Sequence, residues 1–233
     1  MGSNEMDLRD EFIGRVAEGR SFADVGGLWG VVNEKVTVAA RHHARKLTMV
    51  DVSPAEGELW QSFRDRLAAA AVPECECISE DVCALAARAA PAYDVVHCSG
   101  VLYHHPNPVQ LLESLRRITT RYLILTSAVL HESVINQFGS YHLPSSGAVF
   151  VPALDREERE ILWKHWRDDA GVGACYGISE EAKWNPGELG PWWWLFTPRV
   201  MLAMATSVGF RVLESGPTWN GNAHVALLEA VER

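Results

Sequence analysis

Basic residues are scarce in this sequence: 21 Lys and Arg stand against 30 Asp and Glu among 233 residues, giving a formal net charge of −9. Proteins that follow nucleic-acid backbones rely on clustered Lys and Arg to neutralise phosphates. The charge balance therefore disfavours a nucleic-acid partner. Only four basic residues are lysines, and this bias, with abundant alanine, is typical of a GC-rich bacterial genome.

Long apolar runs and paired cysteine motifs are also missing. No run approaches the roughly 20 apolar residues of a membrane-spanning helix, and the charged start MGSNEMDLRDEF lacks the apolar centre of a signal peptide. Five cysteines, an odd number without CxxC pairs, exclude a regular disulfide framework. We expect a cytoplasmic protein with reduced thiols and no membrane partner.

What the sequence does contain is a glycine-dense turn in the segment SFADVGGLWG. A short apolar run reaches Asp24 and is followed by Gly26, Gly27 and Gly30. Glycine accepts positive φ and lets the backbone approach a nucleotide closely. A second apolar run ends at Asp51, 51 − 24 = 27 positions later, where open α/β sheets place a carboxylate on ribose hydroxyls. The pattern predicts a nucleotide-binding α/β protein.

Apolar and amphipathic segments then alternate along the chain, which predicts a parallel sheet with right-handed crossovers. The expected strands are 22–25, 47–52, 75–79, 93–99 and 122–127, and the expected helices are 6–18, 32–43, 58–71, 82–90 and 109–119. Near the C-terminus we expect a helix over 197–210 and paired closing strands over 210–215 and 224–232.

The alternation is lost between residues 130 and 194, where six of the nine tryptophans lie. A long irregular stretch inside a compact domain is usually an active-site cover or disordered, and so many tryptophans argue against disorder. We therefore expect one domain over 1–233, with 130–194 forming a partly helical lid over the substrate.

Several motifs together resemble one family. They are the acid before a glycine turn, the acid that closes the second strand, the segments GVLYHHPNP, LLESLRRI and WWWLFTP, and the TP…GF helix followed by two strands. This set resembles class I S-adenosylmethionine (SAM) methyltransferases, in particular the branch with tRNA uridine carboxymethyltransferases and natural-product methyltransferases. The resemblance implies a Rossmann-like, seven-stranded, mostly parallel sheet with helices on both faces, and SAM as cofactor. The sequence departs from it at Leu28, where the middle glycine is expected.

The resemblance also assigns cofactor-binding residues, all after the first four strands. They are Asp24, Gly26, Gly27, Leu28, Trp29, Gly30, Asp51, Val52, Ser53, Asp81, Val82, Cys98, Ser99 and Gly100. Asp24 would fix the turn or the α-amino group, Asp51 would hold the ribose, and Asp81 would lie near the adenine. Two alternatives stay open: Leu28 and Trp29 can pack under the first helix, and Asp81 can be a helix N-cap.

The catalytic candidates follow the fourth strand. His104 and His105 lie at the carboxyl end of that strand, where open α/β sheets bind ligands, and a neutral histidine is a natural base; Tyr103 joins them. As an alternative, His104 caps the next helix or stacks under SAM. From the lid we expect substrate contacts, with core filling as the alternative, from His131, Tyr141, His142, Trp192, Trp193 and Trp194.

No metal site is expected. Metal-dependent methyltransferases need carboxylates after strands four and five as ligands for Mg²⁺, and this sequence has Cys98, Ser99, Thr126 and Ser127 there. We predict metal-independent methyl transfer to an oxygen or nitrogen of a small aromatic or heterocyclic metabolite, by a monomer or homodimer. The alternatives are a tRNA-modifying (carboxy)methyltransferase, a non-catalytic SAM- or nucleotide-binding module and, last, a dehydrogenase.

Overall fold

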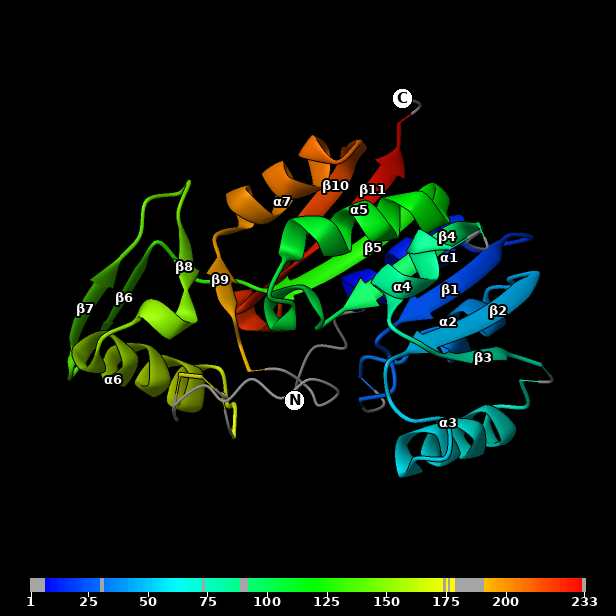
Figure 1. The fold of residues 1–233 in the computed structure, drawn as a ribbon, viewed down its shortest axis with the longest axis horizontal. Coiled ribbons are helices and arrows are strands. Elements are labelled where there is room, and N and C mark those ends of the chain that lie inside the picture. Colours follow the sequence, from blue (N-terminus) through cyan, green and yellow to red (C-terminus); the bar gives the residue numbers. More distant parts are fainter. Residues whose placement is uncertain are drawn as a thin grey trace.

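A seven-stranded sheet in the order β10-β11-β5-β4-β1-β2-β3 forms the centre of the computed structural model (Figure 1), which describes residues 7–29, 32–72, 74–88, 92–173, 175, 177–178 and 191–231. The strands are β1 (Ser21–Val25), β2 (Lys46–Asp51), β3 (Glu76–Ser79), β4 (Tyr93–Ser99), β5 (Thr119–Ala128), β10 (Phe210–Thr218) and β11 (Ala223–Ala230). From β3 to β5 the neighbours are parallel, whereas β11 is antiparallel to both β5 and β10. The predicted mostly parallel α/β sheet is confirmed.

Helices cover both faces of this sheet. On one face lie α4 (Val82–Ala87), α5 (Pro108–Ile118) and α7 (Pro198–Ser207), and on the other lie α1 (Leu8–Val16), α2 (Val36–Arg41) and α3 (Glu58–Ala69). Successive strand residues face opposite sides, so Val95 packs with the α1–α3 cluster and Val96 with the α4–α7 cluster. Burial on both faces explains why the strands read as continuous apolar runs.

The segment between β5 and α7 has a hydrophobic cluster of its own. It contains the hairpin of β6 (Ser133–Asn136) and β7 (Gly139–His142), the helix α6 (Arg156–Lys164), and β8 (Ala148–Phe150) paired with β9 (Trp194–Phe196). Val134, Leu162, Trp166 and Leu195 are buried together in this cluster. The segment is partly helical, as expected, but its short strands were not predicted. Figure 1 shows the β6–β7 hairpin and α6 projecting beyond the edge of the central sheet.

Helix α2 begins four residues later than the sequence predicts. The chain before it runs beneath the glycine turn, where the backbone N–H of Lys35 donates to Asp24 instead of entering a helix. Glu34 then accepts hydrogen bonds from the backbone and hydroxyl of Thr37, within the first turn. In the part of the chain that the structure describes, no helix is long and apolar enough to cross a membrane.

Candidate cofactor and acceptor site

The turn after β1 depends on glycine at position 26. Gly26 has a φ of +77°, and a Cβ there would lie 2.3 Å from Cγ2 of Val101. Its N–H donates to the carbonyl of Val50 at 2.9 Å, which ties the turn to β2. Gly26 lines a cavity at the carboxyl ends of the strands, so close backbone approach to a ligand is possible there.

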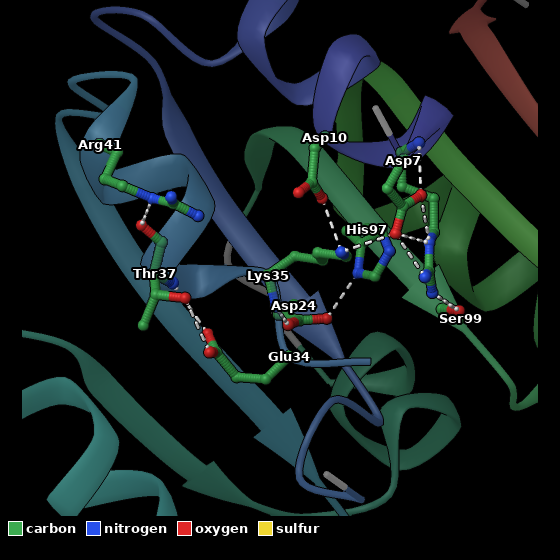
Figure 2. Close-up of polar contacts among 10 residues, drawn as sticks. Asp7, Asp10, Asp24, Glu34, Lys35, Thr37, Arg41, His97 and Ser99 are labelled. Atoms are coloured by element: carbon green, nitrogen blue, oxygen red, sulfur yellow. Dashed lines mark hydrogen bonds and ion pairs between the residues drawn. The ribbon is translucent and has the colours of Figure 1, made fainter. Parts of the chain in front are cut away.

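Asp24 lies beneath this turn and does not line the cavity. Its carboxylate is fully buried, accepts the N–H of Lys35 at 2.7 Å and lies 2.7 Å from Nδ1 of His97 on β4 (Figure 2). A Cβ on Gly27 would lie 2.5 Å from that carboxylate. Of the two roles expected for Asp24, the structure supports fixing the turn. Gly27 likewise serves the packing of the turn and does not face the cavity.

Leu28 and Trp29 differ in environment. Leu28 is 1% exposed and packs in the core with the α1–α3 face, and its backbone N–H points to Asp51 at 3.4 Å. Trp29 is half-exposed and lines the cavity. The alternative of packing under the first helix therefore holds for Leu28 only. The expected contact of Gly30 with the cofactor lies outside the described residues.

Asp51 is the buried carboxylate of the cavity. It is 3% exposed, and its Oδ1 accepts hydrogen bonds from the N–H and hydroxyl of Ser53 at 2.9 and 2.7 Å. The carbonyl of Ser53 is in turn held by Nε1 of Trp60 and the hydroxyl of Ser79. Val52 lines the cavity beside Asp51, whereas Ser53 orients the carboxylate from behind.

Of the two roles predicted for Asp81, the structure shows the helix N-cap, and it also places the residue at the cavity. Its carboxylate accepts the N–H groups of Cys83 and Ala84 at 2.8 and 3.1 Å, so it caps α4, and it also lines the cavity with Val82. Glu80, which the sequence analysis did not single out, lines the same end. This end is therefore acidic.

The cavity itself has a volume of about 520 Å³ and runs across the ends of β1, β2, β3 and β4. Ser99 and Gly100 line it at the end of β4, with Gly100 at a φ of +77°. Cys98 is fully buried in the α4–α7 core instead, and burial raises the pKa of its thiol well above the usual range. Contact between Cys98 and a ligand is therefore not supported by the structure.

The three catalytic candidates all line the cavity but differ in chemistry. Burial raises the pKa of the Tyr103 phenol, so this group is a hydrogen-bond donor and not a base at neutral pH. Nδ1 of His105 accepts the N–H of Asn107, its Nε2 lies 3.7 Å from Sγ of Cys83, and burial lowers its pKa. Both ring nitrogens of His105 therefore already have partners within the protein, namely Asn107 and Cys83. The ring of Tyr103 lies between those of His104 and Trp192, with centroids 4.3 and 4.6 Å away, and the rings of His104 and Trp192 are 6.1 Å apart.

Only one of the three consecutive tryptophans lines the cavity. Trp192 is 5% exposed and its ring lies 4.6 Å from that of Tyr103. Trp193 stacks on Phe150, and Trp194 donates from Nε1 to the carbonyl of Pro106. Trp192 therefore lies at the first cavity, whereas Trp193 packs against Phe150 and Trp194 against the loop before α5.

The remaining lid candidates lie away from the cavity. Tyr141 and His142 belong to the β6–β7 hairpin and line a separate, acidic surface pocket with residues of α6. His131 is exposed and packs beside Gly221 and His165. Sequence reasoning placed these residues over the substrate because they follow β5, but the chain turns outward there.

Sequence reasoning also missed residues that the fold brings to the cavity. Asn33 follows the glycine turn, Val172 comes from the lid, and Trp219 comes from the turn between β10 and β11. Trp219 and Asn220 have φ of 49° and 53°, in the left-handed region, ahead of Gly221. The Gly/Asn content of that loop was the available signal, but it did not indicate which side chain would point inward.

A second chamber of about 400 Å³ adjoins the first. It shares Asn33, Ser99, Gly100, Tyr103 and Trp219 with the first cavity, so the two spaces meet at the end of β4. Its other walls come from α1, the end of β5 and the loop into β11. In the described ranges of the chain, no group of three His, Cys, Asp or Glu residues is arranged to hold a metal ion.

The first comparison concerns the sequence. A family model described as a methyltransferase domain matches residues 24–122, from the glycine turn into β5. This part of the chain is therefore similar to a methyltransferase domain. The matched residues include the turn, Asp51, Asp81 and the three catalytic candidates, and they build most of the first cavity. None of the curated proteins compared with the chain matches it.

Three solved structures resemble nearly the whole chain in fold. Magnesium protoporphyrin IX methyltransferase from Synechocystis PCC 6803, with bound S-adenosylhomocysteine (SAH), is 14% identical, with a TM-score of 0.56 over 98% of this chain and 90% of that one. A putative SAM-dependent methyltransferase from Listeria monocytogenes is 13% identical, with a TM-score of 0.56 over 96% and 98%. The mitomycin 7-O-methyltransferase MmcR is 12% identical, with a TM-score of 0.57 over 96% of this chain and 53% of MmcR.

These structures establish the fold. The described chain has the fold of class I SAM-dependent methyltransferases, so the resemblance inferred from the sequence is confirmed. It spans nearly all of the first two proteins but about half of MmcR. Structures of the Synechocystis enzyme contain SAH or SAM, which is the cofactor that the sequence analysis predicts.

Proposed function

We propose that this protein transfers a methyl group from SAM to an oxygen or nitrogen of a small aromatic or heterocyclic metabolite. The observation that carries the proposal is the pair of joined cavities at the carboxyl ends of the strands, one edged by carboxylates and the other by hydroxyl groups. Two neighbouring spaces of 520 and 400 Å³ are what a two-substrate transfer reaction needs.

The first cavity suits SAM in the orientation that the sequence analysis expects. Asp51 offers a buried carboxylate, pre-oriented by Ser53, to a pair of ribose hydroxyls. Val82 and the Asp81 side of the cavity suit a flat, partly polar adenine, and the Gly26 backbone suits the methionine end. Leu28, which stands where the middle glycine is expected, is compatible with this site, because its side chain belongs to the core and only its N–H faces Asp51.

Methyl transfer from a sulfonium requires alignment more than covalent help, and it requires a base when the acceptor is a hydroxyl. His104 is our candidate for that base, since it lines the cavity within the Tyr103–Trp192 aromatic group. Tyr103 retains its proton and can orient the acceptor by donating a hydrogen bond. His105 is assigned to positioning the loop between β4 and α5 through Asn107.

The acceptor side favours a small molecule over RNA. The second chamber is enclosed by Trp219, Tyr103 and residues of β5, and the overall charge of −9 opposes binding to a polyanion. We further propose that the transfer is metal-independent, since Ser99, Thr126 and Ser127 lie at the ends of β4 and β5, where Mg²⁺-dependent enzymes need carboxylates. A cytoplasmic monomer or homodimer is consistent with this activity.

Calorimetric titration with SAH and with NAD tests the cofactor assignment. We expect micromolar SAH binding and no comparable NAD binding. Asp51→Ala should weaken SAH about ten- to a hundred-fold, because a charged hydrogen-bonding group is lost. The exposed Glu56→Gln, on the same loop, is the matched control. Tight NAD binding without SAH binding would refute the methyltransferase assignment.

Kinetics of His104→Ala test the base. With an acceptor found by screening aromatic metabolites for SAH formation, this variant should lose kcat more than SAH affinity, and the acidic limb of its pH–rate profile should disappear. A near-normal kcat with an unchanged acidic limb would move the base elsewhere.

A further inference from the structure

The charged side chains are divided between the two cavities. Of the residues described, the first cavity is lined by Asp51, Glu80 and Asp81 and by no Lys or Arg. The second is lined by Arg9 and by no Asp or Glu. The carboxylates of the first cavity accept hydrogen bonds, whereas Arg9 at the second cavity donates them.

Arg9 extends from α1 to the second chamber, where Asp7 and Ser99 hold its guanidinium group. Its Nε and Nη2 donate to Asp7, and its Nη1 donates to Oγ of Ser99 at 3.2 Å, although the side chain is only 9% exposed. These contacts use three of its five N–H groups, so two remain to donate. The guanidinium is therefore anchored with donor capacity left at the chamber.

Asp7, the anionic partner of Arg9, also pairs with a second cation. Asp7 also accepts from Nζ of Lys35 at 3.0 Å, and Lys35 contacts Asp10 at 2.6 Å. Although burial opposes ionisation of Asp7, the hydrogen bonds and charges of Arg9 and Lys35 hold its pKa well below the usual range. Asp7 thus stays charged and keeps the guanidinium fixed in orientation.

Thr126 provides a second donor near Arg9, because it pairs in register with Ser99, which accepts from Arg9. It is 5% exposed at the end of β5, lines the chamber, and its hydroxyl has no hydrogen-bond partner among the described residues. A buried hydroxyl without a partner is costly, and the cost is relieved when a ligand supplies an acceptor. Arg9 and Thr126 together match a group that only accepts hydrogen bonds, and an ionised carboxylate is such a group.

We propose that the second chamber binds the methyl acceptor and that this acceptor carries a carboxylate, which receives hydrogen bonds from Arg9 and Thr126. The inference rests on the proposed function. The volume of about 400 Å³ far exceeds a single carboxylate, so the chamber has room for a ring whose reacting atom lies toward Gly100 and Tyr103, where the two cavities meet.

Binding of benzoate and benzamide to the SAH-saturated protein tests the inference, because the two probes have the same ring and differ in the carboxylate. We expect benzoate to bind the unmodified protein at least tenfold more tightly than benzamide. Arg9→Gln should remove this preference. Thr126→Val, which keeps the volume and removes only the unpartnered hydroxyl, should weaken benzoate several-fold. The control Arg15→Gln, on the exposed side of α1, should change neither.

The outcomes separate this inference from the proposed function. Absence of SAH binding to the unmodified protein would remove the proposed function. Normal SAH binding with equal affinity for both probes, with no benzoate binding, or with no effect of Thr126→Val would overturn the carboxylate site. If Arg9→Gln weakens SAH but leaves the benzoate preference intact, Arg9 contacts the cofactor's own carboxylate and the assignment to the acceptor is overturned.

Discussion

The carboxylate of Asp24 and Nδ1 of His97 lie 2.7 Å apart, and neither side chain is exposed to solvent. Together with the Lys35 N–H, this contact joins β1, β4 and the start of α2 beneath the glycine turn. The acid before the turn therefore stabilises the shape of the site without touching the cavity.

Asp24→Ala should consequently destabilise the fold as well as the site. Removing one partner of a buried charged contact and leaving the other unsatisfied costs about 3 kcal/mol, which corresponds to roughly 6–12 °C in Tm for a chain of this size. Thermal unfolding followed by circular dichroism measures the effect, and the exposed Asp65→Ala is the control. An unchanged Tm would mean that the turn is held by other contacts.

A second prediction concerns the contact between Gly26 and Val101. Gly26→Ala should abolish measurable SAH binding for two reasons. The new Cβ would lie 2.3 Å from Cγ2 of Val101, and the alanine would have to keep the left-handed φ of this position. The double variant Gly26→Ala, Val101→Ala removes the clash but keeps the φ penalty of about 1–2 kcal/mol, so it should recover part of the affinity. Calorimetry on the two single variants and the double variant completes the cycle.

The lid should control the acceptor through one tryptophan. Trp192→Ala should raise the acceptor KM or lower kcat by tenfold or more and raise the SAH Kd less, because Trp192 lines the first cavity but packs on Tyr103, which lines both cavities. Trp193→Ala removes an equal side chain that stacks on Phe150, so it should have the smaller kinetic effect. Equal effects of both variants would indicate a general loosening of the lid.

Chelation tests the metal assignment. After exhaustive treatment with EDTA and desalting, SAH formation should stay within about twofold of the untreated rate, since serine and threonine stand where Mg²⁺ ligands are needed. Loss of turnover that added Mg²⁺ restores would contradict the proposal.

Stability should fall in mildly acidic solution. Burial lowers the pKa of His105 and of His224 below the ordinary value of 6.5. Just below that pH the unfolded chain binds more protons than the folded chain, so the free energy of unfolding decreases as the pH falls through 6.5. Tm values at pH 7.5 and 5.5 measure the loss. His224→Gln should reduce it, whereas His43→Asn, which changes an exposed histidine, should not.

The sequence predicted the site residues that lie at the ends of the parallel strands. Gly26, Asp51 and Asp81 lie at or just after the ends of parallel strands, which all finish at one edge of the sheet, so the motif positions implied by the family resemblance placed them at the cavity. Leu28 and Cys98 were assigned to the cofactor by motif position. Their side chains instead point into the core, because successive residues of a strand or turn face opposite sides.

The residues that line the acceptor chamber could not be predicted from the sequence in this way. Arg9, Thr126 and Trp219 come from the first helix, the fifth strand and the last hairpin, and no local pattern links them. Tyr141 and His142 were predicted to contact the substrate because they follow β5. Their hairpin instead extends beyond the sheet, and they line a different pocket.

The turn at Trp219 gives the acceptor chamber a wall that comes from outside the insertion between β5 and α7, although Trp219 also packs on Trp166 of that insertion. Substitutions at Trp219 or Ala223 can reshape the chamber without changing the strands that carry Asp51 and Asp81. During divergence, relatives could thus acquire new acceptors through a few changes in one hairpin. A library confined to this turn is therefore a compact starting point for altering the substrate range.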